Sequence, residues 1–469
     1  MHGDNPLEIP ELVRKISRYV TTNDAIACAR VCKAWSDHFI SAIWDTVDFA
    51  VHDLHQMDTK VLARHGHHIR IVKNMTEYNH IQLLTTSNAN KLKELKVFMM
   101  PSQEFYALFN DLLRRVNTSL EHIDIFQFHR DAVPYFAVDP LFPTTSTEGS
   151  SKLSSIILGG LVMTRDSLSS LLEHCPLLDE LEIQGTTLLS WPTYNSSTAQ
   201  YFQHTGLEEF TAPVEQVFTM DQSYHNTPSL FVHFPNLEKW HALDSKGYVV
   251  DVPIKLIRDE IARHCPSLKT LYLETRPPVG ISVLTQALQN LTAICILNEH
   301  LSAEMVMAIL NHQETLIEVA TFFDGNLLEM EVIPEVESHQ LDTSGWIVQS
   351  LPRRCTRLKI FELILLEVDM DDIEMTDWGC HDLEELSIRI KGLDTKQEID
   401  RTIQLWEEGR IAVSKKQVMD VQVESSMSPQ LEGIIPPSDN SIEARVARHL
   451  LKFKKLRQVW LGWKVRKVA

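Results

Sequence analysis

The chain has 469 residues, of which 44% are hydrophobic and 23% charged, a balance typical of a folded globular protein. Its formal net charge of −19 argues against a nucleic-acid surface that covers the whole chain. Apolar runs break well before ~18 residues, and the start MHGDNPLEIP lacks a basic segment followed by an apolar one, so we expect neither a membrane span nor secretion. Seven cysteines in this context predict reduced thiols rather than a disulfide framework.

The stretch IPELVRKISRYV predicts a short amphipathic helix near the start of the chain, with Pro10 in its first turn. Three- and four-residue steps place five apolar residues on one helix face, namely Ile9, Leu12, Val13, Ile16 and Val20. Asn23-Asp24 then offers an N-cap for a second helix, and a third helical segment runs over 35–44. Three such helices bury only a small core, so their remaining apolar residues are most easily explained if another molecule or domain covers them.

This opening segment, from Pro6 to about Trp44, resembles an F-box motif in its leucine-proline-glutamate form, with Ile9 standing where leucine is commoner. The resemblance implies that the helices dock on a Skp-type linker subunit and, through it, on the cullin of an SCF-type ubiquitin ligase. The contacts that it implies, carried over by position, are Ile9, Pro10, Leu12, Ile16, Val31 and Trp35. The alternative is a helical cap that only covers the end of the next domain.

A short pattern, L-x-x-L-x-L with conservative exchanges, recurs along the rest of the chain. Its copies begin at residues 92, 120, 153, 178, 207, 237, 268, 291, 316, 358, 383 and 456. The first nine starting positions are 23 to 33 residues apart, the range of leucine-rich repeats. The last two apolar positions alternate as in a strand, whereas stretches such as 166–174, 256–264 and 303–311 have helical spacing.

One strand and one helix per repeat predict an α/β solenoid, a horseshoe or arc with a curved parallel sheet. We therefore expect an F-box over 1–48, a helical linker or N-terminal cap over 49–91, repeats with loop insertions over 92–441, and a basic capping helix with the last strand over 442–469. The longest insertions fall at 139–152, 189–206 and 423–441, and an extra helix is expected around 395–412.

Cysteines precede the pattern at one fixed offset, as Cys175, Cys265 and Cys355 each stand three residues before its first leucine. Phe234 occupies the same place in another copy, so we expect a small buried apolar group at a helix-to-strand corner rather than a metal ligand. The segments CPLLDELEI and CPSLKTLYL resemble the cysteine-containing repeats common in F-box proteins.

Charge is unevenly distributed near the C-terminus. Residues 322–385 hold sixteen Asp and Glu against four Arg and Lys, whereas 442–469 hold nine Arg and Lys against one Glu. A solvated acidic face and a basic capping helix explain this pattern, with a site for a basic target segment as the alternative.

Motifs for catalysis do not occur in the sequence: G-x-S-x-G, the P-loop, G-x-G-x-x-G and H-E-x-x-H are all absent. The histidines of RHGHHIR (His65, His67, His68) lack a cysteine pair that would complete a metal set, so we expect a solvated turn there. We expect a protein that is not an enzyme and uses no cofactor or metal.

Two functions fit these features. The first is a substrate-recognition adaptor of an SCF-type ubiquitin ligase in the cytoplasm or nucleus, with a Skp-type subunit, a cullin and a target protein as partners, and neither membrane nor nucleic acid. The second is a leucine-rich-repeat scaffold unrelated to ubiquitin. Target-binding candidates on the concave face are His122, Glu180, Glu182, Lys239, His241, Tyr272, Glu274, Glu362, Glu385 and Trp460. The loop around Trp191 and Tyr194 is an alternative target site.

Overall fold

The computed structural model of the chain describes residues 9–17, 19–51, 59–99, 102–127, 138–142, 151–184, 186–188, 202–213, 217, 229–243, 254–273, 282, 285–286, 288–297, 301–322, 349–420 and 439–461. These residues belong to two compact units, Met1–Leu237 (unit 1) and Glu238–Ala469 (unit 2). Each unit combines a parallel sheet with helices, which confirms the α/β class and the parallel sheet predicted from the sequence.

Unit 1 opens with three short helices, α1 (Pro10–Ser17), α2 (Thr22–Ala29) and α3 (Lys33–Trp44). They enclose a small core of Val13, Ala25 and Phe39. The second helix begins slightly before the predicted cap, because the Thr21 side chain accepts a hydrogen bond from the backbone N–H of Asp24.

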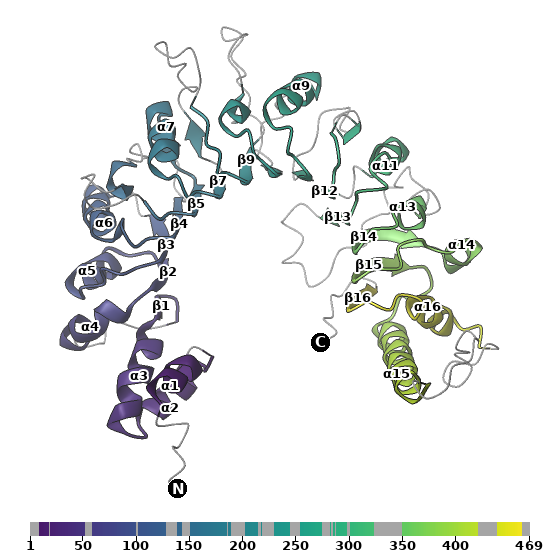
Figure 1. Cartoon of the computed structure of the whole chain (residues 1–469), viewed down its shortest axis with the longest axis horizontal. Coiled ribbons are helices and arrows are strands. Elements are labelled where there is room, and N and C mark those ends of the chain that lie inside the picture. Colours follow the sequence, from purple (N-terminus) through teal and green to yellow (C-terminus); the bar gives the residue numbers. More distant parts are fainter. Residues whose placement is uncertain are drawn as a thin grey trace. The chain divides into compact units, whose positions relative to one another are not determined.

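The sheet of unit 1 has seven parallel strands among its described residues, in the order β1-β2-β3-β4-β5-β7-β9. They are β1 (Thr46–Asp48), β2 (Ile71–Met75), β3 (Glu94–Met99), β4 (His122–Gln127), β5 (Ser155–Gly159), β7 (Glu180–Gln184) and β9 (Glu209–Pro213). The helices α4 (Thr59–His65), α5 (Tyr78–Thr86), α6 (Gln103–Val116) and α7 (Arg165–His174) lie on one side of this sheet (Figure 1). Short 3-10 turns are η3 (Gly66–His68), η5 (Asp139–Leu141) and η7 (Leu230–His233), and β6 (Val162–Met163) pairs with β8 (Thr187–Leu188) in a separate small sheet.

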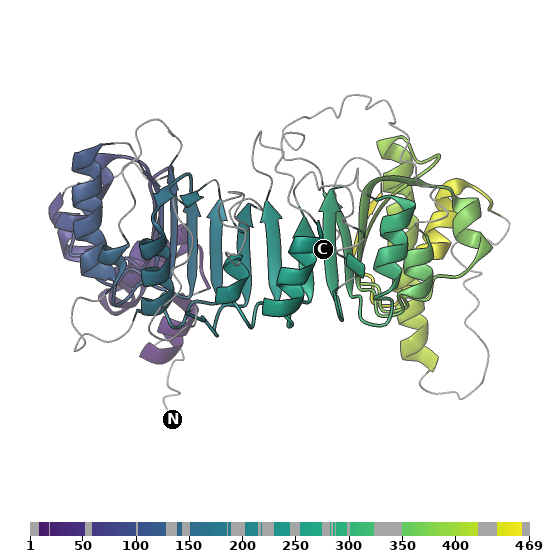
Figure 2. The same cartoon turned by 90° about the horizontal axis from the view of Figure 1, so that it is seen from above.

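Unit 2 repeats this arrangement in seven described strands ordered from β10 to β16. They are β10 (Lys239–Leu243), β11 (Thr270–Leu273), β12 (Ala293–Leu297), β13 (Glu318–Phe322), β14 (Ile360–Val368), β15 (Glu385–Ile390) and β16 (Gln458–Leu461). The helices are α9 (Ile254–His264), α11 (Ala303–Leu310), α13 (Ser350–Arg354), α14 (Met370–Met375), α15 (Lys396–Asp420) and α16 (Ile442–Leu450). Within each unit the strands run side by side in the same direction (Figure 2).

The repeated sequence pattern and the strands coincide. In all twelve copies the strand begins two residues after the leading leucine, and that leucine is at most 2% exposed. In β3, for example, Leu95 and Val97 are buried while Glu94 and Lys96 reach the surface. The period-two alternation of a strand therefore assigns each residue of the pattern to the core or to the opposite face of the sheet.

Backbone hydrogen bonds repeat at one position of the pattern. The N–H of Glu121 donates to the carbonyl of Lys93 at 2.8 Å, and the N–H of Lys269 donates to the carbonyl of Glu238 at 2.8 Å. These residues follow the leading leucine in adjacent copies, and their side chains also form ion pairs. Each copy therefore satisfies the polar backbone of its neighbour at the same point.

The cysteines lie at the corners where helices lead into strands, as the sequence predicts. The N–H of Leu178 donates to the carbonyl of Cys175 at 3.1 Å, and the same bond recurs at Cys265, Cys355 and Phe234. Burial raises the pKa of Cys175 to about 11 and that of Cys355 to about 12, so these thiols stay protonated. Cys380, three residues before Leu383, is a fourth member that the sequence analysis did not single out.

The first two strands precede the predicted start of the repeats. β1 and β2 fall in the segments expected to be F-box and helical linker, and β2 pairs with β3. Ile69 and Val72 are buried like the leucines of later copies, but Asn74, with a positive φ of 55°, interrupts the alternation. This interruption made β2 unrecognisable as a repeat strand. The helix expected around 395–412 is present as the longer α15.

Candidate interaction surfaces

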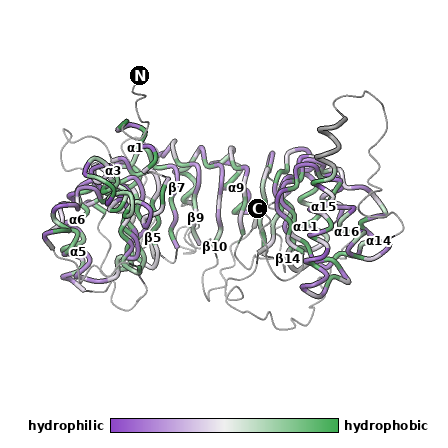
Figure 3. Tube along the Cα trace, turned by 90° about the horizontal axis from the view of Figure 1, so that it is seen from below, coloured by the Kyte–Doolittle hydropathy of each residue, from purple (hydrophilic) through white to green (hydrophobic). Residues whose placement is uncertain are grey.

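The N-terminal helices carry apolar side chains that their own core does not bury. Ile9 is 37% exposed and Leu12 and Ile16 are each 41% exposed. Because successive helical residues turn by ~100°, these three side chains lie along one edge of the apolar stripe, while Val13 and Ser17 lie toward the core. Figure 3 shows hydrophobic residues along α1. We call Ile9, Leu12 and Ile16 the docking face.

The other residues implied by the F-box resemblance have mixed positions. Pro10 begins α1 and is exposed, and Val31, in the turn after α2, is 64% exposed. Trp35 is partly buried and packs against the core of the three helices, with its ring centroid 5.6 Å from that of Phe39. Trp35 therefore helps to hold the three helices together, in contrast to the exposed Pro10 and Val31.

A second candidate surface is the face of each sheet opposite the helices, which we call the open face. Strand register places its side chains in two rows, one from the first and one from the third residue of each strand. In unit 1 the open face holds His122, Glu180 and Glu182. In unit 2 it holds Lys239, His241, Tyr272, Glu362, Glu385 and Trp460. Glu274, Trp191 and Tyr194 lie outside the described residues.

Opposite charges alternate on the open face of unit 1. Lys73 lies 3.7 Å from Glu94, and Lys96 lies 3.7 Å from Asp124. Ser155 donates a hydrogen bond to Glu180 at 2.7 Å. Burial raises the pKa of Asp124, and the Lys96 ammonium opposes that rise.

Three carboxylates lie close together on the open face of unit 2. Glu318 lies in the same row as Glu385, two strands away, and Glu362 lies on the strand between them. Burial raises the pKa of Glu318, with repulsion from Glu385 adding to it, and the Tyr272 hydroxyl donates a hydrogen bond that opposes the rise. Burial also raises the pKa of Glu362, and the nearby charges of Glu385 and Glu318 raise it further.

Glu318 was not among the residues predicted from the sequence. It is the third residue of the weak copy LIEVAT, whose start gives the position of its strand. That position alone identifies an open-face residue, but its proximity to two other carboxylates depends on the pairing of β13 with β14 and of β14 with β15.

Aromatic side chains flank these carboxylates. The rings of His241 and Tyr272 lie 4.2 Å apart between centroids, on the adjacent strands β10 and β11. Trp460 on β16 is aligned with Ser387, which in turn is aligned with Glu362. The open face of unit 2 thus offers both negative charge and flat apolar surface.

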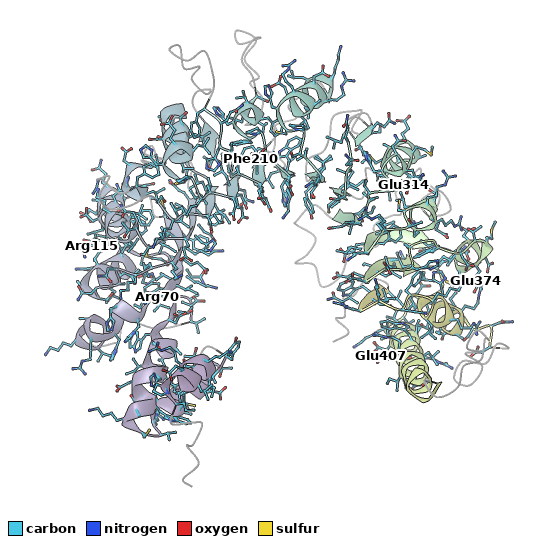
Figure 4. The ribbon with its side chains drawn as sticks, in the orientation of Figure 1. Arg70, Arg115, Phe210, Glu314, Glu374 and Glu407 are labelled. Carbon is cyan, nitrogen blue, oxygen red and sulfur yellow. The ribbon has the colours of Figure 1, made fainter. Side chains whose placement is uncertain are left out.

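The basic C-terminal helix pairs with part of the acidic segment. Arg445 on α16 forms ion pairs with Asp371 and with Glu374, which lies on the helical side of unit 2 (Figure 4). Lys452 lies 2.6 Å from Asp377. These contacts engage acidic residues of α14 and the turn after it, not those of the open face.

The histidines of RHGHHIR lie where α4 ends and η3 follows. The His67 and His68 rings are 3.9 Å apart, and burial lowers the pKa of His68. Across the described ranges, no group of three or more His, Cys, Asp or Glu is arranged to hold a metal ion. None of the helices in the same ranges is both long and apolar enough to span a bilayer.

No protein-family model matches the chain, and no curated protein matches its sequence.

Proposed function

We propose that this chain is a substrate-recognition adaptor of an SCF-type ubiquitin ligase. In this proposal α1 to α3 form an F-box that docks on a Skp-type linker subunit, and the strand-and-helix copies are leucine-rich repeats that hold a target protein. The observation that carries the proposal is the docking face of Ile9, Leu12 and Ile16, left exposed by a helix whose other side already packs in a core. Exposed apolar side chains grouped in this way are typical of interaction sites.

An adaptor of this kind contributes positioning rather than chemistry. It holds a target lysine near the ubiquitin-charged enzyme and raises their effective concentration, so it needs no nucleophile or cofactor of its own. Such a role suits a protein of the cytoplasm or nucleus. The buried, protonated cysteines of the repeat corners fit a structural role in such a protein.

Binding to a Skp-type subunit tests the proposal directly. The wild-type chain should co-purify with that subunit, and a variant with Ile9→Asp and Leu12→Asp should lose it. Docking can bury only the exposed part of each side chain, which contributes about 1 kcal/mol, and an aspartate in the contact adds a desolvation cost, so the two substitutions together should weaken binding roughly tenfold or more. Because both side chains are substantially exposed, the variant should keep the circular dichroism spectrum of the wild type.

Met307→Asp is the matched control, since Met307 is an exposed apolar residue on α11 in unit 2. It introduces the same kind of charge but leaves the docking face intact, so binding should be unchanged. If the folded wild type does not bind the Skp-type subunit, the ligase adaptor is excluded. The helices would then be a cap on a repeat scaffold.

A further inference from the structure

We propose that the open face of unit 2 binds an extended protein segment that carries lysine or arginine side chains. The surface, which we call the acidic face, consists of Glu318, Glu362 and Glu385 with the rings of His241, Tyr272 and Trp460. The statement that this segment belongs to a ubiquitylation target rests on the proposed function. Recognition of the basic segment itself does not depend on that function.

The spacing of the carboxylates suits cationic side chains. Glu318 and Glu385 are aligned with Ile360 between them, so their strands are separated by two inter-strand steps of ~4.8 Å each. Glu362 lies two residues beyond Ile360 on the same face, which is ~6.8 Å along the strand. Three carboxylates within this area can surround one or two ammonium or guanidinium groups.

Among the described residues, few positive charges lie beside these three carboxylates. Within the described part of the chain, neither Glu362 nor Glu385 has a lysine or arginine within ion-pair distance, and Lys239 acts on Glu318 only as a nearby charge. Unit 1 differs, because Lys73 and Lys96 accompany the acidic residues of its open face. A bound cation would therefore relieve the repulsion among the carboxylates of the acidic face.

The aromatic rings suit the aliphatic parts of the lysine and arginine side chains of such a segment and its backbone. Tyr272 lies against His241 with the two rings tilted, and Trp460 lies on the far side of the carboxylates, across β14 and β15. Rings at these places can contact the aliphatic stems of lysine and arginine and attract their charged ends. The buried indole N–H of Trp460 also lacks an acceptor within the described residues, and a backbone carbonyl of an incoming segment would satisfy it.

A competing occupant is the end of this chain. Residues 462–469 follow β16 and include Lys464, Arg466 and Lys467. A binding test must therefore distinguish this internal segment from a separate protein. A chain that ends at Leu461 provides that distinction.

A short labelled peptide that alternates lysine with serine serves as the probe, with a glutamate-serine peptide for comparison. Fluorescence anisotropy with the full chain should show binding of the lysine peptide alone, and raising NaCl from about 50 to about 300 mM should weaken it. A variant that combines Glu318→Gln, Glu362→Gln and Glu385→Gln should bind the lysine peptide roughly tenfold more weakly, because each glutamine keeps the shape of the glutamate side chain but lacks its charge.

The control replaces three carboxylates of unit 1, with Glu94→Gln, Glu180→Gln and Glu182→Gln, and should leave binding within about twofold of wild type. Equal weakening by both sets of substitutions would show attraction to net charge alone and would overturn the proposal. If the chain that ends at Leu461 binds the lysine peptide roughly tenfold more tightly than the full chain, the chain's own end occupies the acidic face. That result would also overturn the proposal. The peptide assay contains no Skp-type subunit, so its outcome is independent of the docking test.

Discussion

His449 should make unit 2 sensitive to mild acid. The residue lies on α16 and is only 5% exposed, with its ring 4.8 Å from Trp378 and 5.3 Å from Phe453. Neither ring nitrogen has a hydrogen-bond partner within the described residues. Burial lowers the pKa of His449 from 6.5 to about 3; the Lys452 charge contributes to the fall, and Asp377 opposes it.

The sign and size of the effect follow from proton linkage. Between pH 6.5 and 3 the unfolded chain binds a proton at His449 that the folded chain does not, so the free energy of unfolding falls as the solution is acidified. Each pKa unit corresponds to ~1.4 kcal/mol, so lowering the pH from 7 to 5 should remove about 2 kcal/mol at this residue. The full contribution is present only well above pH 6.5.

His449→Phe tests the reasoning, because phenylalanine keeps a ring against Trp378 and Phe453 but cannot be protonated. Urea unfolding followed by circular dichroism at pH 7 and pH 5 should show that the variant loses about 2 kcal/mol less than wild type on acidification. His381→Gln, at an exposed histidine of the same unit, should behave as wild type. If wild type and His449→Phe lose equal stability between these pH values, the argument from burial is refuted.

Three further predictions concern the repeats. Gly160→Ala should destabilise unit 1 by more than ~1 kcal/mol, because φ is +66° and a Cβ would meet the Gln127 carbonyl at 2.1 Å. Gly392→Ala shares a positive φ, but its Cβ would make only an ordinary van der Waals contact with Ile442 at 3.9 Å, so the same urea titration should show a smaller loss. Leu181→Ala should cost ~2–5 kcal/mol in that assay, since its side chain is fully buried. A thiol reagent should modify exposed Cys32 in the native protein but reach the buried cysteines only after unfolding; these are Cys175, Cys265, Cys295, Cys355 and Cys380.

The strands were predictable because one residue type defines them. Each copy has a leading leucine that is buried in the core, and the strand begins at a constant offset of two residues after it. The same rule failed for β2, where isoleucine and valine replace leucine and Asn74 adopts a left-handed conformation. It also could not locate the start of α2, which Thr21 determines through a local side-chain hydrogen bond.

The interaction surfaces were predictable in part. Alternation alone assigned Glu362 and Glu385 to the open face, since Glu362 stands between the buried Phe361 and Leu363, and Glu385 stands directly before the buried Leu386. Their electrostatic coupling to Glu318 was not predictable, because it depends on pairing between strands that are far apart in sequence. The exposure of Ile9 likewise required the structure, since periodicity groups it with Val13, which is buried.

The carboxylates of the acidic face that favour binding of a basic segment also lower the stability of the folded chain at pH 7. For Glu318 and Glu362 the pKa in the folded chain lies above the usual value, so folding favours their protonated forms. Stability from these groups is therefore greatest in acid and declines as the pH rises through the raised pKa values, which leaves a penalty at pH 7. Neutral glutamine lacks that penalty, so Glu318→Gln and Glu362→Gln, which weaken binding of a basic segment, should raise the free energy of unfolding. Carboxylates that only support the fold would show the opposite, with stability falling on their removal.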